Sequence, residues 1–178
     1  MTRTELEQCI DLYGKDIFSF CRYATGSLQE GEELYQDTFL KAVELMKKMD
    51  MSQNPKSFLL SIAVKLWKNK QRKYAWRQRI AGMESLEEKG EYQNIPSNMA
   101  SALPEESLLQ KEQKQMVYQC IRELSQKYQL LLYLYYASDL SVNEIAVLLK
   151  VPEGAVKSRL HKARKLLKEQ LEDAGYDK

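Results

Sequence analysis

Apolar side chains recur every three to four positions along most of the chain, the spacing that gives a helix one apolar face. Strand-like alternation of apolar and polar residues is nearly absent. Gly26 directly follows the first apolar run and is a residue type that often ends helices. The pattern therefore predicts an all-α protein whose first helix has an inward face made of Leu6, Ile10, Tyr13, Ile17, Phe20 and Ala24.

The same rhythm divides the chain into two helical parts. A second run follows between residues 34 and 49, and a third begins at Asn54-Pro55, an N-cap followed by proline at the first helical position. Beyond Arg79 the rhythm stops, and the next residues are mainly Glu, Ser, Asn, Gly and Pro with single hydrophobic residues. We predict a small helical domain over residues 1–80, a flexible linker over 81–104 and a second small helical domain over 105–178.

The second domain contains a sharp helix-start signal. Ser141 can cap a helix, and Glu144, at the third helical position, can bond back to it as in a capping box. The expected helix Val142–Leu149 is followed by a turn at Lys150-Val151-Pro152 and by a second short helix that begins at Glu153. Two short helices joined by a tight turn indicate a helix-turn-helix.

The distribution of charged residues along the chain indicates the kind of partner. The totals are nearly balanced, with 27 Lys+Arg against 25 Asp+Glu. However, Lys65 to Arg79 contains seven basic residues and no acid, and Lys150 to Lys168 contains seven basic residues and one acid, Glu153. Two basic segments separated by an acidic stretch are typical of two contacts with a polyanion.

The sequence lacks the features of several function classes. The three cysteines are far apart, form no C-x-x-C pair and have one His to complete a metal site, so we predict reduced thiols and no metal. A Gly-rich phosphate loop and paired metal ligands are missing, so we expect no enzyme and no cofactor. The longest apolar runs fall short of the ~18 residues of a membrane span, and no signal peptide is recognisable. We therefore expect a cytoplasmic protein that is not embedded in a membrane.

The segment EIAVLLKVPEGAVKSRLHKARKLL, residues 144–167, resembles the fourth conserved region of extracytoplasmic-function (ECF) sigma factors of bacterial RNA polymerase. That region reads approximately E-I-A, a short helix, then G-T-V-K-S-R-L and, two residues later, A-R; Ala155 stands where Thr is usual. In the family the second helix enters the major groove of the minus-thirty-five element. A basic face that meets only water is the alternative. The resemblance implies base contacts from Lys157, Ser158, His161 and Lys162, and phosphate or mixed contacts from Arg159 and Arg164.

A second resemblance lies upstream. The segment GEELYQDTFLKA, residues 31–42, is similar to the second conserved region of the same family, A-E-D-L-V-Q-D-T-F-L-K-A. In the family this helix binds the coiled-coil clamp of the RNA polymerase largest subunit. Without the resemblance, a polar helix face that meets water would be the default interpretation. The resemblance implies that contacts with core polymerase come from Glu33, Gln36, Asp37 and Lys41.

The segment Lys56–Arg79 interleaves aromatic and basic residues. Unpaired bases stack on aromatic rings while Lys and Arg follow the phosphates, so this composition suits a melted DNA strand. The resemblance places the segment on the minus-ten element and the loop Lys48–Asn54 at a flipped base. For Trp67, burial in the core and base stacking both remain open. The expected minus-ten contacts are Lys65, which stands where Asn is frequent, Lys68, Asn69, which replaces the usual Asp, Arg72, Lys73 and Trp76.

The two resemblances, in this order with a linker between them, imply a sigma factor that binds core RNA polymerase and directs initiation at specific promoters. They also imply control by an anti-sigma factor, itself anchored in the membrane. A conventional helix-turn-helix regulator is the first alternative, although neither a sensor domain nor a dimerisation heptad is recognisable. A sigma factor of the divergent clostridial toxin-gene type is the second, and it would share the mechanism but not the regulon.

Overall fold

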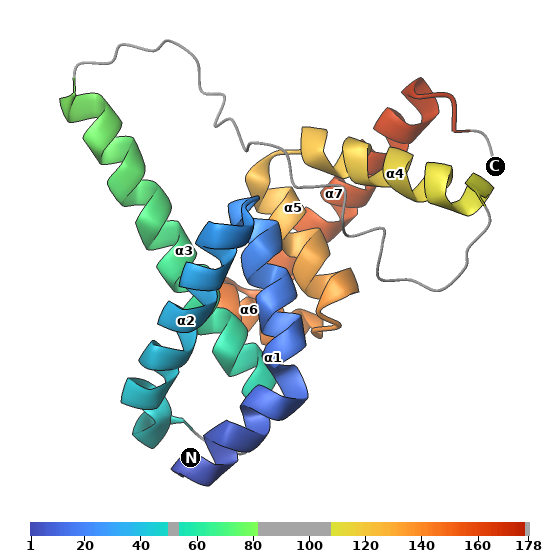
Figure 1. The fold of residues 1–178 in the computed structure, drawn as a ribbon. Coiled ribbons are helices and arrows are strands. Elements are labelled where there is room, and N and C mark those ends of the chain that lie inside the picture. The colour runs from blue at the N-terminus through green and yellow to red at the C-terminus, as the bar shows by residue number, and fades with distance from the viewer. Residues whose placement is uncertain (50–53, 82–107, 177–178) are drawn as a thin grey trace. The chain divides into compact units, whose positions relative to one another are not determined.

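The computed structural model describes residues 1–49, 54–81 and 108–176. Its regular structure within these ranges is entirely helical, which confirms the predicted all-α class, and the chain divides into two compact units, Met1–Pro96 and Ser97–Lys178 (Figure 1). Apart from Ala81, the predicted linker over 81–104 lies outside the described residues, as do residues 50–53 of the predicted Lys48–Asn54 loop.

Three helices build the first unit: α1 (Arg3–Thr25), α2 (Leu28–Leu45), which continues into a 3-10 turn at Met46–Lys48, and α3 (Pro55–Ile80). Each of the three packs against the other two. Gly26 ends α1 in the left-handed conformation, at a φ of 68°, and the Asn54 side chain accepts a hydrogen bond from the backbone N–H of Lys56 at the start of α3. Both predicted helix signals are confirmed.

The core of the first unit follows the predicted stripes closely but not completely. Ile10 is 37% exposed, and Cys9 takes the inward position one residue earlier. Thr38 is fully buried, and its hydroxyl donates to the carbonyl oxygen of Leu34 at 2.6 Å, so its burial leaves no unpaired donor. The largest fully buried side chains of this unit are Ile17, Phe20, Leu34, Leu59 and Leu60.

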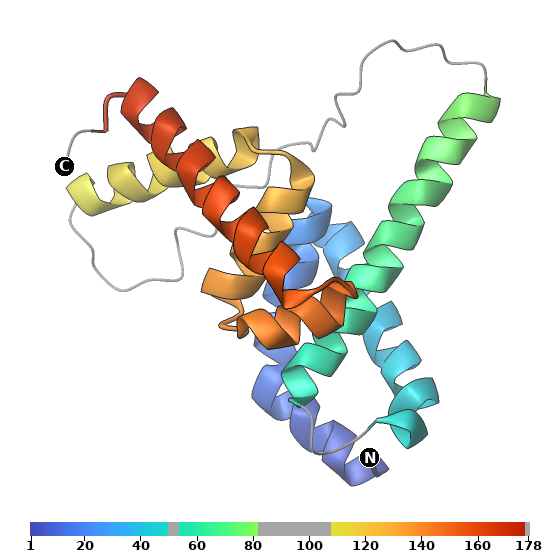
Figure 2. The ribbon, with the colours of Figure 1, turned by 180° about the vertical axis from the view of Figure 1, so that it is seen from behind.

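The second unit contains α4 (Leu108–Glu123), α5 (Gln126–Leu132), a π-helical turn at Tyr133–Ala137, α6 (Val142–Leu149) and α7 (Glu153–Asp173). The predicted short second helix is wrong, because α7 is 21 residues long. Apolar residues continue beyond the first turns of α7, and this helix packs against α4 and α5 as well as α6 (Figure 2). The contacts with α4 and α5 therefore stabilise the later turns of α7, which extend beyond the helix-turn-helix itself.

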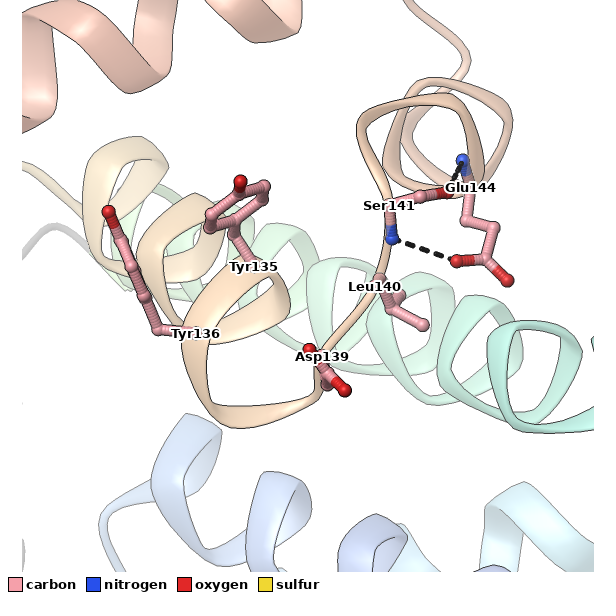
Figure 3. Close-up of a pocket in the computed structure, with 6 residues that line it drawn as sticks. All are labelled: Tyr135, Tyr136, Asp139, Leu140, Ser141 and Glu144. Carbon is pink, nitrogen blue, oxygen red and sulfur yellow. Dashed lines mark hydrogen bonds between the residues drawn. The ribbon is translucent and has the colours of Figure 1, made fainter.

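The predicted capping box starts α6. The backbone N–H of Glu144 donates to Ser141 Oγ at 3.2 Å, and the backbone N–H of Ser141 donates to Glu144 Oε2 at 2.8 Å (Figure 3). The chain leaves α6 at Lys150 in the left-handed conformation, with a φ of 56°, and α7 begins three residues later. Leu148 is the buried residue of the last turn of α6, whereas Leu149 is half-buried.

None of the helices in the described part of the chain combines the length and the apolar character needed to cross a membrane.

Candidate nucleic-acid and protein interfaces

One side of α7 is basic and open to solvent. The opposite side is buried through Val156, Leu160 and Ala163, which fixes the rotation of the helix about its axis. Residues three and four positions apart share a face of a helix, so Lys157, His161 and Arg164 form one outward stripe. All six residues predicted to contact the minus-thirty-five element are exposed, namely Lys157, Ser158, Arg159, His161, Lys162 and Arg164.

The hydrogen bonds at the start of α7 connect it to the preceding helix. Asn143 Nδ2 on α6 donates to Glu153 Oε1, the first residue of α7, at 2.7 Å. Ile145 and Ala146 of α6 are buried, and α6 packs against α7. This bond and this packing hold the two helices of the motif at a fixed angle, which lets the outward stripe of α7 act as one surface.

Arg164 is the one member of this set with a contact that sequence reasoning missed. Its Nε donates to the hydroxyl of Tyr136 at 2.7 Å, and its guanidinium carbon lies 5.4 Å and 5.6 Å from the ring centroids of Tyr135 and Tyr136. Because Tyr136 is 28 residues earlier in the chain, no local pattern connects it with Arg164.

The two halves of α3 differ in burial. Its first half supplies core residues up to Trp67, which is 7% exposed, whereas no residue from 68 to 80 is buried. Figures 1 and 2 both show this second half extending past α1 and α2. Trp67 therefore belongs to the core of the first unit, which decides the question that the sequence left open.

The predicted minus-ten residues lie along one stripe of α3, and all except Lys65 are in its exposed half. Trp76 is 64% exposed and follows Arg72 by four residues and Lys65 by eleven, spacings that keep all three on one side of the helix. Tyr74 is equally exposed, at 67%, but lies on the other side of the helix. The Arg72 guanidinium donates to the side-chain oxygen of Asn69 at 2.6 Å. Of the predicted set, Asn69 is half-buried, and the exposed members are Lys65, Lys68, Arg72, Lys73 and Trp76.

The outer face of α2 carries the residues predicted to contact core polymerase. Glu33, Gln36, Asp37 and Lys41 are all exposed, opposite the buried side of the helix. Glu33 forms an ion pair of 3.2 Å with Lys70 of α3, and Lys41 pairs with Glu44.

Leu40, which sequence reasoning also missed, is 66% exposed on this outer face of α2. Its neighbours on the helix surface, three and four residues earlier, are Asp37 and Gln36. An exposed leucine within a polar rim is the usual anatomy of a protein-binding surface.

The described residues contain no cluster of three or more His, Cys, Asp or Glu side chains that could hold a metal ion. All three cysteines are free and buried. Burial raises the pKa of the Cys21 thiol to about 12, so this cysteine is a poor nucleophile at neutral pH.

Comparison with known proteins connects the two units to one family. Residues 9–77 match the family model for Sigma-70 region 2, and residues 114–167 match that for Sigma-70, region 4. The chain is 30% identical over 168 residues to the ECF RNA polymerase sigma factor SigW of Bacillus subtilis (strain 168), which covers 92% of this chain and 87% of SigW. This chain belongs to the ECF RNA polymerase sigma factors.

A second relative and a solved structure agree with this membership. The ECF sigma factor SigX of the same organism is 25% identical over 165 residues, which cover 91% of this chain and 81% of SigX. The structure of the sigma factor RpoE in complex with the anti-sigma factor NepR from Bartonella quintana has a TM-score of 0.68 at 22% identity, covering 94% of this chain and 97% of that one. At this identity the solved structure supports the ECF fold alone.

Proposed function

We propose that this ECF sigma factor binds core RNA polymerase through the outer face of α2, captures the melted minus-ten strand on α3 and reads the minus-thirty-five duplex with α7. Residues 1–80 then form the polymerase and minus-ten domain, and residues 105–178 form the minus-thirty-five domain. The observation that carries the proposal is that three exposed surfaces of distinct chemistry fall on the segments matched to Sigma-70 regions 2 and 4. Catalysis stays with the polymerase, in the cytoplasm.

The proposed polymerase surface consists of Glu33, Gln36, Asp37 and Lys41 around Leu40. The ion pairs that Glu33 and Lys41 make are exposed, and such pairs contribute little to stability. These side chains can therefore exchange their present partners for polymerase groups at small cost. Leu40 adds the apolar contact that the centre of a stable interface requires.

Substitution of Gln36 and Asp37 by Ala tests this surface. We expect weaker co-purification with core polymerase and unchanged helix content, because both side chains are exposed. A matched control replaces Gln8 and Asp11, the same residue types on the exposed side of α1. If the α2 variant binds core polymerase as tightly as the control, the assigned surface is wrong.

The proposed reading of the minus-thirty-five element depends on position along α7. Recognition helices contact bases with their first turns, so Lys157, Ser158, His161 and Lys162 are the proposed base readers. Arg159 and Arg164 are the proposed phosphate or mixed contacts. Lys157→Ala and Lys162→Ala should each cost ~1–3 kcal/mol on the correct promoter duplex and much less on a scrambled one. Equal weakening on both duplexes would reduce these lysines to electrostatic anchors.

We also propose that an anti-sigma factor, anchored in the membrane, holds this chain inactive. A sigma factor whose fold this chain shares, RpoE, was solved in complex with an anti-sigma factor. The proposal predicts that protein isolated from unstressed cells carries a stoichiometric inhibitor. Fully active protein without one would contradict it.

A further inference from the structure

Two adjacent tyrosines hold the side chain of Arg164. The hydroxyl of Tyr136 accepts a hydrogen bond from Arg164 Nε at 2.7 Å. The guanidinium also lies within cation–π distance of both rings, at 5.4 Å from the Tyr135 centroid and 5.6 Å from that of Tyr136. Tyr136 is 60% exposed, so this cluster lies at the surface. Three contacts on an exposed arginine restrict a side chain that would otherwise sample many rotamers.

The π-helical turn at Tyr133–Ala137 provides the two rings from consecutive positions. The backbone N–H of Ser138 donates to the carbonyl oxygen of Tyr133 at 2.9 Å, which closes this wide turn. The two rings meet edge to face, with centroids 4.9 Å apart and planes at 81°. Figure 3 shows both rings projecting from the same side of the turn, away from Asp139. Single π-helical turns of this kind occur frequently at functional sites.

The contact leaves most of the arginine's hydrogen-bonding capacity for another partner. A guanidinium has five N–H donors, and Tyr136 engages the one on Nε. The remaining four are on the two terminal nitrogens, in the fork geometry that matches a phosphate. Arg164 shares the outward stripe of Lys157 but lies about 10 Å further along the helix axis. A residue beyond the groove-inserted turns faces the DNA backbone rather than base edges.

We propose that Tyr136, supported by Tyr135, is a positioning residue that presents Arg164 to a backbone phosphate of the DNA bound by α7. The inference rests on the proposed function in one respect, namely that α7 binds duplex DNA. It differs from two simpler roles for Tyr136. In one, its hydroxyl contacts DNA directly. In the other, the cluster only stabilises the second unit.

The experiment uses the full chain and a fluorescent random-sequence duplex, because a phosphate contact does not require the cognate promoter. Four proteins are compared with wild type: Tyr136→Phe, Arg164→Ala, the double variant, and Tyr118→Phe. The last removes a hydroxyl from an exposed tyrosine of α4 and is the matched control. Affinity is measured by anisotropy across a salt series, and the thermal midpoint is recorded for each protein.

Tyr136→Phe retains the ring and the charge of Arg164 but removes the hydrogen bond, so we expect affinity to fall about two- to tenfold, the cost of ordering one free side chain. Its salt slope should equal that of wild type, whereas Arg164→Ala should lower the slope by about one ion. In the Arg164→Ala background, Tyr136→Phe should have no further effect on affinity. Tyr118→Phe should bind as wild type does.

Three results would overturn the inference. Unchanged affinity of Tyr136→Phe would show that the hydrogen bond does not prepare Arg164 for DNA. An equal loss in the presence and absence of Arg164 would assign Tyr136 a contact of its own. A loss of affinity that follows a lower thermal midpoint would indicate a structural role. Failure of the wild-type chain to bind any duplex would instead refute the DNA-binding part of the proposed function, and the inference with it.

Discussion

Replacement of Trp76 by Ala separates the proposed DNA contact of α3 from its structural role. Trp76 is 64% exposed, so its removal should change the free energy of unfolding by at most ~0.5 kcal/mol. Trp67, nine residues earlier on the same helix, is 7% exposed and belongs to the core. Its replacement by Ala should cost ~3–5 kcal/mol of stability. Trp76→Ala thus tests the DNA contact, and Trp67→Ala tests the structural role of the same helix.

The expected functional effect follows from base stacking. One base stacked on an aromatic ring contributes ~1–3 kcal/mol, which corresponds to a loss of about five- to 150-fold in affinity when the ring is removed. Tyr74→Ala is the matched control, because Tyr74 is 67% exposed on the other side of α3, away from Lys65 and Arg72. We expect this variant to bind as wild type does.

The assay measures binding of the reconstituted holoenzyme to a forked promoter fragment whose minus-ten segment is single-stranded on the non-template strand. A fully duplex fragment serves as reference, and urea denaturation monitors stability. Trp76→Ala should lose affinity for the forked fragment far more than for the duplex. Equal losses for Trp76→Ala and Tyr74→Ala, or no loss for either, would refute the stacking surface assigned to the Lys65–Trp76 stripe.

Three further predictions concern stability and are measured by denaturant unfolding. Gly31→Ala should lower the free energy of unfolding by ~1–2 kcal/mol, because the new Cβ would lie 3.1 Å and 3.2 Å from backbone atoms of Arg22 and would force α1 and α2 apart by a few tenths of an ångström. Gly154→Ala meets no atom within 4 Å and should raise the free energy of unfolding by up to ~1 kcal/mol. Equal behaviour of the two variants would contradict the close approach of α1 and α2. Ser141→Ala should cost ~1 kcal/mol through loss of the cap of α6, and an unchanged midpoint would show that the capping box is not needed. Because burial raises the pKa of Cys21 to about 12, the unfolded chain loses this proton first. The contribution of the protonated Cys21 thiol to the free energy of unfolding is therefore complete below the ordinary thiol pKa of ~8.5. Above that pH the free energy of unfolding declines by up to ~1.4 kcal/mol per pH unit. Cys21→Ala should show a shallower alkaline decline, and an identical decline would remove Cys21 as its cause.

Local signals were sufficient for most of the fold. Gly26, Asn54-Pro55 and the Ser141–Glu144 pair each determine a helix end through contacts within four residues, and each behaves as the sequence indicates. The length of α7 was not predictable in this way, because its later turns are stabilised by packing against α4 and α5. The spacing of apolar residues predicts which face of a helix is buried, but it does not predict which distant helix packs against that face.

The candidate site was also predictable from the sequence only in part. The basic and aromatic residues of α3 and α7 could be named from composition and from resemblance to the family. Trp67 and Trp76 look alike in the sequence, and what separates them is the place where the core of the first unit ends along α3. The contact between Tyr136 and Arg164 joins residues 28 positions apart and depends on a π-helical turn, which no local sequence pattern indicates.

Transcription in vitro measures directly whether this chain directs initiation at specific promoters. Core RNA polymerase is combined with the purified chain and a library of promoter fragments, and the transcripts are sequenced. We expect initiation from a small set of promoters that share minus-ten and minus-thirty-five elements. This initiation should depend on the chain and should be abolished by joint replacement of Gln36 and Asp37. Transcripts that are no more specific with the chain than without it would contradict its assignment as a promoter-recognition subunit.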